Sequence, residues 1–327
     1  MYTIGEMFRK RREEKGLSRW DACDGICSEP TISRFERGEQ NPARETIVQL
    51  LERVDLPVEL AEMYETQYEI KAMELVQEIN DAIRYGDTRE LQRLLNELQA
   101  TVANKENYRE LVAFVEIVLK QHEGVDIEEL YKITYELTNS FMDKFKPSMI
   151  KKSLLSRRQI SILNLLASYK NKLEKKEEVK TKKEEEIKTE KKEEIKTKEK
   201  GKGEGILIWK ELVDYIDKRG QYARIADIYA EIVYNLSAGL GFRGRHKECI
   251  TLANKGIEHC IKYNVFGAFA GLLENKGFGL IALGVAEEGK KLVTEAYVIY
   301  HSRGEANKAK KTKELALSMG VDIKKLY

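Results

Sequence analysis

The residues best suited to recognising another molecule lie in one short segment near the N-terminus, residues 28–41. This segment spaces hydroxyl, guanidinium, carboxylate and amide side chains as a helix and its flanks would: Ser28, Glu29, Thr31, Ser33, Arg34, Arg37, Gln40 and Asn41. Hydroxyls bond to several base edges, and a guanidinium forks onto the two acceptors of guanine. Ile32 and Phe35, three residues apart, turn inward and leave the polar groups outside. The segment predicts a helix that reads the major groove of double-stranded DNA.

The preceding residues predict the helices that position this segment. A first helix is expected over residues 4–15, and Ser18 caps a second one. Ser28 caps the third helix, which is expected over residues 29–37 because Pro30 is tolerated in a first helical turn. These three helices make a helix-turn-helix, whose last member is the recognition helix.

Contacts with phosphate are expected on both sides of the recognition helix. Arg19, at the start of the second helix, and the amides of Gln40 and Asn41 are placed to hold phosphates, which fixes the register while the third helix reads bases. The first forty residues also contain eight basic side chains: Arg9, Lys10, Arg11, Arg12, Lys15, Arg19, Arg34 and Arg37. Such a cluster is typical of a nucleic-acid binder. The alternative is a small helical bundle with a solvated charged face.

The segment ISRFERGEQNP is similar to the signature of repressor-type (XRE, Cro/C1-like) helix-turn-helix domains. More narrowly, DGICSEPTISRFERGE resembles the Rgg/PlcR/PrgX group of peptide-pheromone-responsive regulators. The resemblance implies an N-terminal five-helix repressor-like domain. It also implies a dimer whose concave repeat surface binds short imported peptides and thereby alters how the two DNA-binding heads are presented. Glu29–Pro30 depart from the pattern, since a polar amide often meets bases there, and Glu29 would accept from a cytosine amine or repel phosphate.

The rest of the chain predicts an α-solenoid. Apolar residues recur at spacings of three and four residues, which is typical of helices. The expected helices are 59–85, 88–103, 106–121, 127–145, 149–173, 206–219, 222–242, 246–262, 266–283, 286–301 and 305–318. Asn235 and Asn275 begin similar stretches 40 residues apart, which is near the period of two-helix repeats. Asn164 has nearly the same place in a third copy. The pattern predicts tetratricopeptide-like repeats stacked into a curved solenoid.

A charged insert interrupts the third copy. EEVKTKK, EEIKTEK and EEIKTKE form an eight-residue repeat whose apolar residues cannot line up on one helical seam. The insert is expected to be a mobile, solvated segment or a lone charged helix, placed inside the second helix of that repeat. The expected organisation is a DNA-binding domain over residues 1–57 and a linker helix over 58–70. The repeat domain follows in two parts, 71–173 and 206–327, with the insert 174–205 between them.

An asparagine on an inner helix suits peptide binding, because its amide can donate to a peptide carbonyl and accept from a peptide N–H. Asn164, Asn235 and Asn275 would form a ladder along the concave face, with Glu231 and Phe278 as neighbours. The alternative is that these asparagines cap or bridge adjacent helices.

The sequence argues against several other classes of protein. No stretch approaches a membrane span, so a cytoplasmic protein is expected. The four cysteines are interpreted as packing residues, and the scattered histidines predict neither a catalytic residue nor a metal site or cofactor.

We expect a non-enzymatic, all-α transcription regulator that binds double-stranded DNA, dimerises with itself and senses a short signalling peptide. One recognition helix contacts too few base pairs for useful specificity. A dimer places two recognition helices about one turn of DNA apart and so reads a longer site. The alternatives are a repressor controlled by a protein partner with no peptide, and an interaction scaffold that has lost DNA binding.

Overall fold

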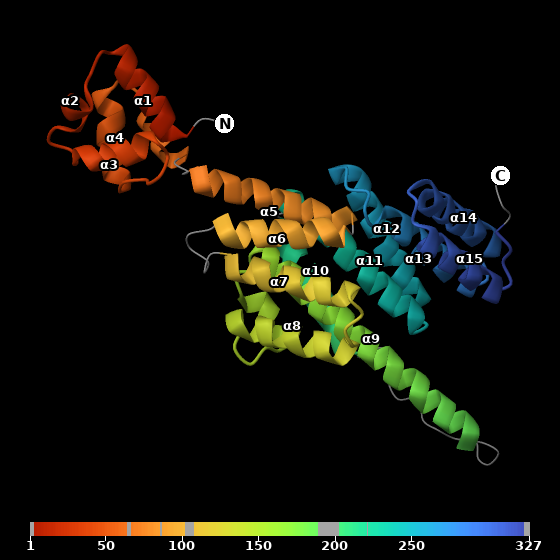
Figure 1. Ribbon diagram of the computed structural model, residues 1–327. Coiled ribbons are helices and arrows are strands. Elements are labelled where there is room, and N and C mark those ends of the chain that lie inside the picture. Colours follow the sequence, from red (N-terminus) through yellow and green to blue (C-terminus); the bar gives the residue numbers. More distant parts are fainter. Residues whose placement is uncertain are drawn as a thin grey trace. The chain divides into compact units, whose positions relative to one another are not determined.

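The computed structural model describes residues 3–63, 67–85, 87–101, 108–188, 203–220 and 222–323. Within these ranges every regular element is a helix, as expected from the sequence (Figure 1). The chain forms two compact units, Met1–His122 and Glu123–Tyr327, and each is described by itself. In the part of the chain covered by these ranges, no helix is long and apolar enough to cross a membrane.

The N-terminal part of the first unit is a five-helix domain. Its elements are α1 (Ile4–Glu14), α2 (Arg19–Cys23), α3 (Glu29–Glu36), α4 (Arg44–Arg53) and the 3-10 helix η1 (Val58–Met63). Phe8 and Phe35 are fully buried at its centre, with ring centroids 5.6 Å apart. The three expected helices therefore form within one or two residues of their expected ends.

Three further helices complete the first unit: α5 (Gln67–Tyr85), α6 (Thr88–Thr101) and α7 (Arg109–His122). α6 packs against both α5 and α7 through a leucine-rich core. The single helix expected over 59–85 is wrong at its start, because residues 58–63 form the 3-10 helix η1 that packs on α4. The rest of the expected linker helix, beyond residue 66, belongs to α5, and residues 64–66 lie outside the described ranges.

The second unit is a stack of antiparallel helices. Its elements are α8 (Ile127–Phe141), η3 (Pro147–Lys152), α9 (Arg157–Lys188), α10 (Glu204–Arg219), η4 (Tyr222–Arg224), α11 (Ala226–Phe242), α12 (His246–Tyr263), α13 (Phe269–Ala282), α14 (Ala286–Ser302) and α15 (Ala306–Ser318). Each helix from α8 to α15 packs against the next (Figure 1). The fold confirms the expected helical repeats.

The two repeats marked by the asparagines are α11–α12 and α13–α14. Each pair turns at a glycine with positive φ, Gly244 at 76° and Gly284 at 86°. Within the second pair the backbones touch: a Cβ on Gly289 would lie 2.6 Å from the Gly277 carbonyl oxygen. Small residues at these positions are therefore required by the close approach of α13 and α14.

The first helices of successive pairs pack side by side. α11 contacts both α9 and α13, whereas no contact of comparable extent joins α10 to α12 or α12 to α14 in the described residues. Helices that converge on one side and separate on the other produce a curved stack, with the first helices on its concave side. We call the side formed by α9, α11, α13 and α15 the inner face.

The charged insert does not lie where the sequence predicted. α9 continues without a break from Arg157 to Lys188, and α10 then packs back on α9. The insert therefore lengthens the first helix of its pair and the connection after it, because Lys and Glu are good helix formers and no Gly or Pro stops α9 earlier. The remainder of the insert, residues 189–202, lies outside the described ranges.

Candidate functional site

The recognition helix α3 is held against α1 by an unusually close backbone contact. A Cβ placed on Gly5 would lie 1.7 Å from the carbonyl oxygen of Phe35, so only glycine fits there. Gly5 was not singled out from the sequence, where nothing distinguishes it from other glycines. Its effect is to let α3 sit directly on α1 and turn its other side outward.

A buried ionic cluster connects the first three helices. Glu36 is fully buried and lies between two guanidiniums, that of Arg12, which is also buried, and that of Arg19, whose Nε donates to Glu36 at 2.8 Å. Arg12 also donates to the Leu17 carbonyl at 2.7 Å. Buried charges persist when paired and hydrogen-bonded, so the cluster fixes α3 relative to α1 and α2.

The turn between α2 and α3 is closed from α4. Arg53 donates to the carbonyls of Asp21 and Asp24 at 2.8 and 3.0 Å, which satisfies the end of α2. Ser28 caps α3 and accepts from the backbone N–H of Thr31, and its hydroxyl also bonds with that of Thr31 at 2.8 Å. The capping predicted for Ser28 is confirmed. Two of the predicted DNA contacts are therefore already bonded to each other.

The outward side of α3 carries the residues predicted from the sequence. Ile32 and Phe35 are buried, while Glu29, Arg34 and Arg37 are exposed and Thr31 and Ser33 are half-buried. Beyond the helix, Gln40 is exposed and Asn41 half-buried. The expected inner and outer sides of the recognition helix are confirmed.

The two arginines of α3 differ in how they are engaged. Arg37 donates to both carboxylate oxygens of Glu39, at 2.7 and 2.9 Å, and to the Ser33 hydroxyl at 2.6 Å. This pair holds the pKa of Glu39 below its ordinary value. The Arg34 side chain makes no hydrogen bond or ion pair with any described residue, although its charge, after that of Arg37, helps to lower the pKa of Glu39. Arg34 is thus the recognition-helix cation that is not held in a direct pair.

Trp20, which is next to Arg19 on α2, was not among the residues predicted to contact DNA. Its side chain is 61% exposed, an unusual state for tryptophan. Arg19 is only partly exposed, and its Nε–H is bonded to Glu36. If Arg19 binds phosphate as predicted, it must do so with its remaining N–H groups. The signal available in the sequence was a tryptophan at the start of the expected second helix.

The expected basic footprint of the first forty residues is wrong as stated. Those residues contain as many acidic side chains as basic ones, namely Glu6, Glu13, Glu14, Asp21, Asp24, Glu29, Glu36 and Glu39. The structure pairs the basic groups with carboxylates: Arg9 with Glu13, Arg11 with Glu14, and Arg37 with Glu39. Any attraction of this domain to DNA must therefore come from a few cationic side chains at particular positions and not from its net charge.

Asn164 and Asn235 meet on the inner face. The Asn164 side chain is buried, and its carbonyl oxygen accepts from the Trp209 indole at 2.8 Å and from the Asn235 amide at 3.2 Å. Asn235 itself is half-buried. The two asparagines thus bridge α9 and α11, the alternative role weighed from the sequence, and their part in peptide binding stays a prediction.

Asn275 bridges the next pair of inner helices. Its amide donates to the Tyr234 carbonyl at 3.1 Å and to the Ser237 hydroxyl at 2.8 Å, both on α11. Phe278, one turn further along α13, packs against the C-terminal core cluster that includes Val293. Phe278 therefore does not lie in the row formed by the asparagines.

Glu231 lies one turn before Asn235 and faces the same set of groups. It is exposed to solvent, yet the surrounding protein reduces its hydration and raises its pKa, an effect partly offset by a hydrogen bond with Asn164. The structure thus brings Glu231, Asn164 and Asn235 together, as the sequence predicted.

A second carboxylate on the inner face was missed by the sequence reasoning. Glu274, next to Asn275, accepts from the Tyr300 hydroxyl at 3.2 Å and from the Thr312 hydroxyl at 2.7 Å. Burial raises the pKa of Glu274. Burial, and after it the charges of Glu274, Glu231 and Glu305, raises the pKa of Tyr234 to about 12. Glu274 directly precedes Asn275, the asparagine that marks the second repeat, and this adjacency was the signal available in the sequence.

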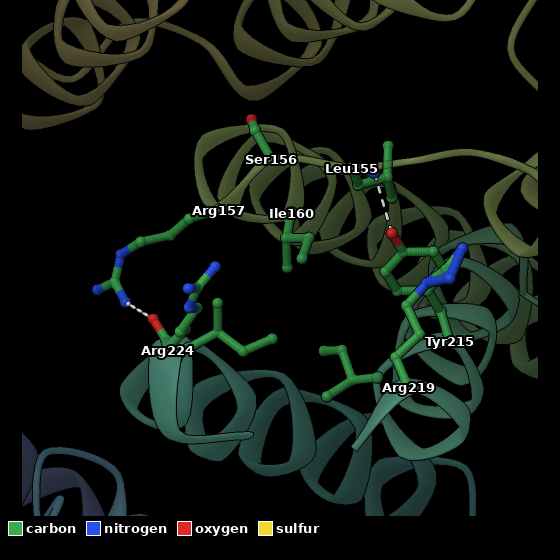
Figure 2. A pocket seen from close by; sticks show the side chains of 9 residues that line it. Leu155, Ser156, Arg157, Ile160, Tyr215, Arg219 and Arg224 are labelled. Atoms are coloured by element: carbon green, nitrogen blue, oxygen red, sulfur yellow. Dashed lines mark hydrogen bonds between the residues drawn. The ribbon is translucent and has the colours of Figure 1, made fainter. Parts of the chain in front are cut away.

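A pocket also opens at the edge of the second unit, where α9 begins and α10 ends (Figure 2). Its volume is about 260 Å³, and its apolar lining includes Ile160, Ile216 and Ile225. Two of its arginines bond to neighbouring segments. Arg157 on α9 donates to the Arg224 carbonyl and to Asp227 on α11, and Arg219 at the end of α10 donates to the Ser153 carbonyl. These bonds join the helices around the pocket, so we interpret it as a structural junction.

The four cysteines are free, and three of them are buried. Burial raises the pKa of Cys249 and of Cys260 to about 11, so both remain thiols at neutral pH. Cys23 is part of the core of the five-helix domain and Cys27 packs against it. Their interpretation as packing residues is confirmed.

Comparison with known proteins identifies the five-helix domain at the N-terminus. Residues 3–63 match a family model described as a helix-turn-helix domain. No curated protein matches the chain in sequence.

Solved structures resemble the chain over nearly its whole length. Bacillus thuringiensis PlcR in complex with the peptide PapR7 and DNA has a TM-score of 0.56 at 16% identity, covering 94% of this chain and 99% of PlcR. Its apo form has the same score and identity, covering 93% and 97%. The competence regulator ComR from Streptococcus vestibularis, in complex with its signalling peptide XIP, has a TM-score of 0.53 at 14% identity, covering 97% and 98%.

At these identities the likeness concerns the fold. The resemblance to the Rgg/PlcR/PrgX group seen in the sequence is confirmed at that level. Residues 3–63 are a helix-turn-helix domain, and the whole chain shares the fold of PlcR and ComR.

Proposed function

We propose that the protein is a sequence-specific DNA-binding transcription regulator that reads the major groove with α3. The observation that carries this proposal is the outward position of Arg34 on a recognition helix whose opposite side is fixed by Phe35 and Glu36. A free guanidinium on a rigid helix can fork onto guanine without first breaking an internal pair. The proposed DNA-contacting surface also includes Ser33 and Arg37 on α3 and the flanking Gln40 and Asn41. Arg19 and Ser28 lie at its edge.

The regulator is proposed to act as a homodimer in the cytoplasm. A single α3 contacts too few base pairs for useful specificity, and a dimer places two copies on neighbouring half-sites. PlcR and ComR have been solved with peptides, and their fold is shared over nearly the whole chain. By this analogy the helical repeats sense a short peptide on the inner face. To regulate, the peptide must bind one arrangement of the dimer better than another.

The test for the DNA-binding part is a matched pair of arginine variants. A duplex is selected from a random library with the full-length protein, and binding is followed by fluorescence anisotropy at several salt concentrations. Arg34→Ala should weaken binding by about ten- to a hundredfold, the cost of one bidentate base contact. Arg93→Ala removes an equal charge from α6, where Arg93 pairs with Glu90 and Glu97, and should bind as wild type does. Equal binding by Arg34→Ala and wild type would remove α3 from the recognition role.

One observation favours a second function, an interaction scaffold that has lost DNA binding. Carboxylates flank the recognition helix at Glu29 and Glu39, and Glu39 occupies the guanidinium of Arg37. Phosphate would have to compete with Glu39 for that guanidinium. Failure to select any duplex at physiological salt would favour the scaffold over the regulator.

A further inference from the structure

The pocket at the start of α9 has an apolar interior. Ile160, Ile216, Ile225 and the ring of Tyr215 line it, and each of these residues is at most 8% exposed. The pocket has a volume of about 260 Å³. An apolar cavity of about 150 Å³ accommodates benzene, so this larger space admits a body of about ten non-hydrogen atoms. The interior therefore suits the apolar part of a small molecule.

The hydrogen bonds of the junction hold the walls of this pocket in place. The Tyr215 hydroxyl accepts from the Leu155 N–H at 2.9 Å, and Arg157 donates to the Arg224 carbonyl at 2.6 Å. These bonds join residues that are 60 and 67 positions apart in the sequence, so the walls are positioned by the fold and not by one flexible loop. A ligand that enters a preformed pocket does not have to order its walls, which favours binding.

The charged groups that line the pocket are all positive. Arg157, Arg219 and Arg224 contribute three guanidiniums, and none of the nine lining residues is acidic. Figure 2 shows Arg157 and Arg224 on one side of the hollow and Arg219 on the other. A guanidinium binds a carboxylate through two parallel N–H bonds. The surroundings of the apolar interior therefore favour a ligand that carries a negative charge.

The three arginines differ in their availability to a ligand. Arg157 pairs with Asp227 at 2.7 Å, and Arg219 donates to the Ser153 carbonyl at 2.9 Å. The side chain of Arg224 is exposed and makes no hydrogen bond or ion pair with any described residue. Arg224 can therefore bind a carboxylate without first breaking an internal contact. One unpaired cation beside an apolar hollow matches a ligand with a single negative charge.

We propose that this pocket binds a small apolar monocarboxylate, an aryl or alkyl carboxylic acid of about ten non-hydrogen atoms. The apolar body lies among the three isoleucines, and the carboxylate is bound by Arg224. The site is separate from the recognition helix α3 and from the row of asparagines on the inner face. The inference is therefore independent of the proposed reading of DNA and of the proposed sensing of a peptide.

The experiment compares a carboxylate with its neutral isostere. 3-Phenylpropionate, 3-phenylpropanamide and acetate are each titrated into the full-length protein by isothermal titration calorimetry. 3-Phenylpropionate should bind, and the amide should bind about tenfold more weakly because it cannot form a charge-assisted pair with a guanidinium. Acetate, which has the charge but almost no apolar body, should give no measurable binding.

A matched pair of variants assigns the charge effect to one residue. Arg224→Gln should weaken binding of 3-phenylpropionate about tenfold and leave binding of the amide unchanged. Lys218→Gln removes an equal charge from an exposed position on α10 that does not line the pocket, and should bind both compounds as wild type does. Both substituted residues are exposed, and circular dichroism shows that the variants are folded.

Hydrogen exchange locates the bound ligand. 3-Phenylpropionate should slow backbone amide exchange in residues 153–160 and 215–225, the segments that form the pocket. No binding at millimolar concentration, or protection confined to other helices, would overturn the site. Equal binding of the acid and the amide, or equal affinity of Arg224→Gln and Lys218→Gln for the acid, would overturn the assignment of a carboxylate ligand to Arg224.

Discussion

Arg19 donates its Nε proton to the fully buried carboxylate of Glu36 at 2.8 Å, so a residue that we propose to contact phosphate is also bound to the domain interior. Phosphate binding by Arg19 and the stability of the helix-turn-helix are thereby coupled. Substitution of Arg19 should affect both, which distinguishes it from Arg34, a residue with no internal partner in the described chain.

The Glu36 cluster should dominate the stability of the N-terminal domain. Glu36→Gln leaves the buried Arg12 with only the half-exposed carboxylate of Glu13, 3.5 Å away, as a counter-charge. Breaking a buried pair costs about 3–5 kcal/mol. Urea unfolding of the full-length chain, followed by Trp20 emission in a Trp209→Phe background, measures the effect. Asp55→Asn, which removes only the exposed partner of Lys15, should change stability by less than about 1 kcal/mol. Equal effects of the two substitutions would contradict the structural role of Glu36.

Glu39 should act as an internal competitor for DNA. Glu39→Gln removes the carboxylate that binds Arg37 in a bidentate pair, and should raise affinity for the selected duplex several-fold, about 1 kcal/mol. Anisotropy titrations against salt check this, because a released guanidinium adds to the salt dependence. Glu14→Gln, which removes the carboxylate partner of Arg11 on α1, is the matched control. A loss of affinity in Glu39→Gln would indicate that the pair instead orders Arg37 for binding.

Trp20 should report DNA binding directly. It is 61% exposed beside Arg19, whereas Trp209, the other tryptophan of the chain, is 2% exposed and bonded to Asn164. Iodide should quench Trp20 in the free protein, and duplex binding should shield it by roughly half or more of the accessible signal if α2 lies against the backbone. The measurement is a Stern–Volmer titration with and without duplex, in wild type and in Trp20→Phe. Unchanged quenching on DNA binding would place α2 away from the interface.

Glu231 should make the repeat domain less stable as pH rises. Its folded pKa is raised above the ordinary value of 4.5, so the folded state holds a proton that the unfolded state has lost. Stability therefore falls as pH rises from about 4.5 through the folded pKa, and Glu231→Gln should remove this loss. Thermal unfolding of both proteins at pH 4.5 and pH 7.5 is the check. The variant should be the more stable protein at the higher pH only, and an equal difference at both pH values would argue against the carboxylate charge as the cause.

The contact between α13 and α14 should tolerate no side chain. Gly289→Ala places a Cβ 2.6 Å from the Gly277 carbonyl oxygen, and overpacking of this kind costs about 1–3 kcal/mol. Gly267→Ala is the control, because nothing lies within 4 Å of its Cβ position. Thermal unfolding followed by far-ultraviolet circular dichroism compares them. Similar melting temperatures would mean that α13 and α14 can separate without cost.

Local signals in the sequence were enough to predict the helices and the outward side of α3. Ser18 and Ser28 act within a few residues, and each caps its helix as expected. The long-range partners were not predictable in this way. Glu36 pairs with Arg12 across 24 residues and Asn164 with Asn235 across 71, and nothing in the local pattern specifies which charged or amide groups will meet. The wrong basic footprint has a different cause, because the equal number of acidic residues in the first forty was visible in the sequence and the exposed pairs are local.

The touching backbones of Gly277 and Gly289 also constrain how the repeat stack can deform. Because the main chains meet where Gly277 faces Gly289, we expect α13 and α14 to resist sliding and to move together. A change in the curvature of the stack is then expected between the helix pairs, where side-chain amides such as those of Asn164 and Asn235 make the contact. Exchange of those amide hydrogen bonds would accompany such a change.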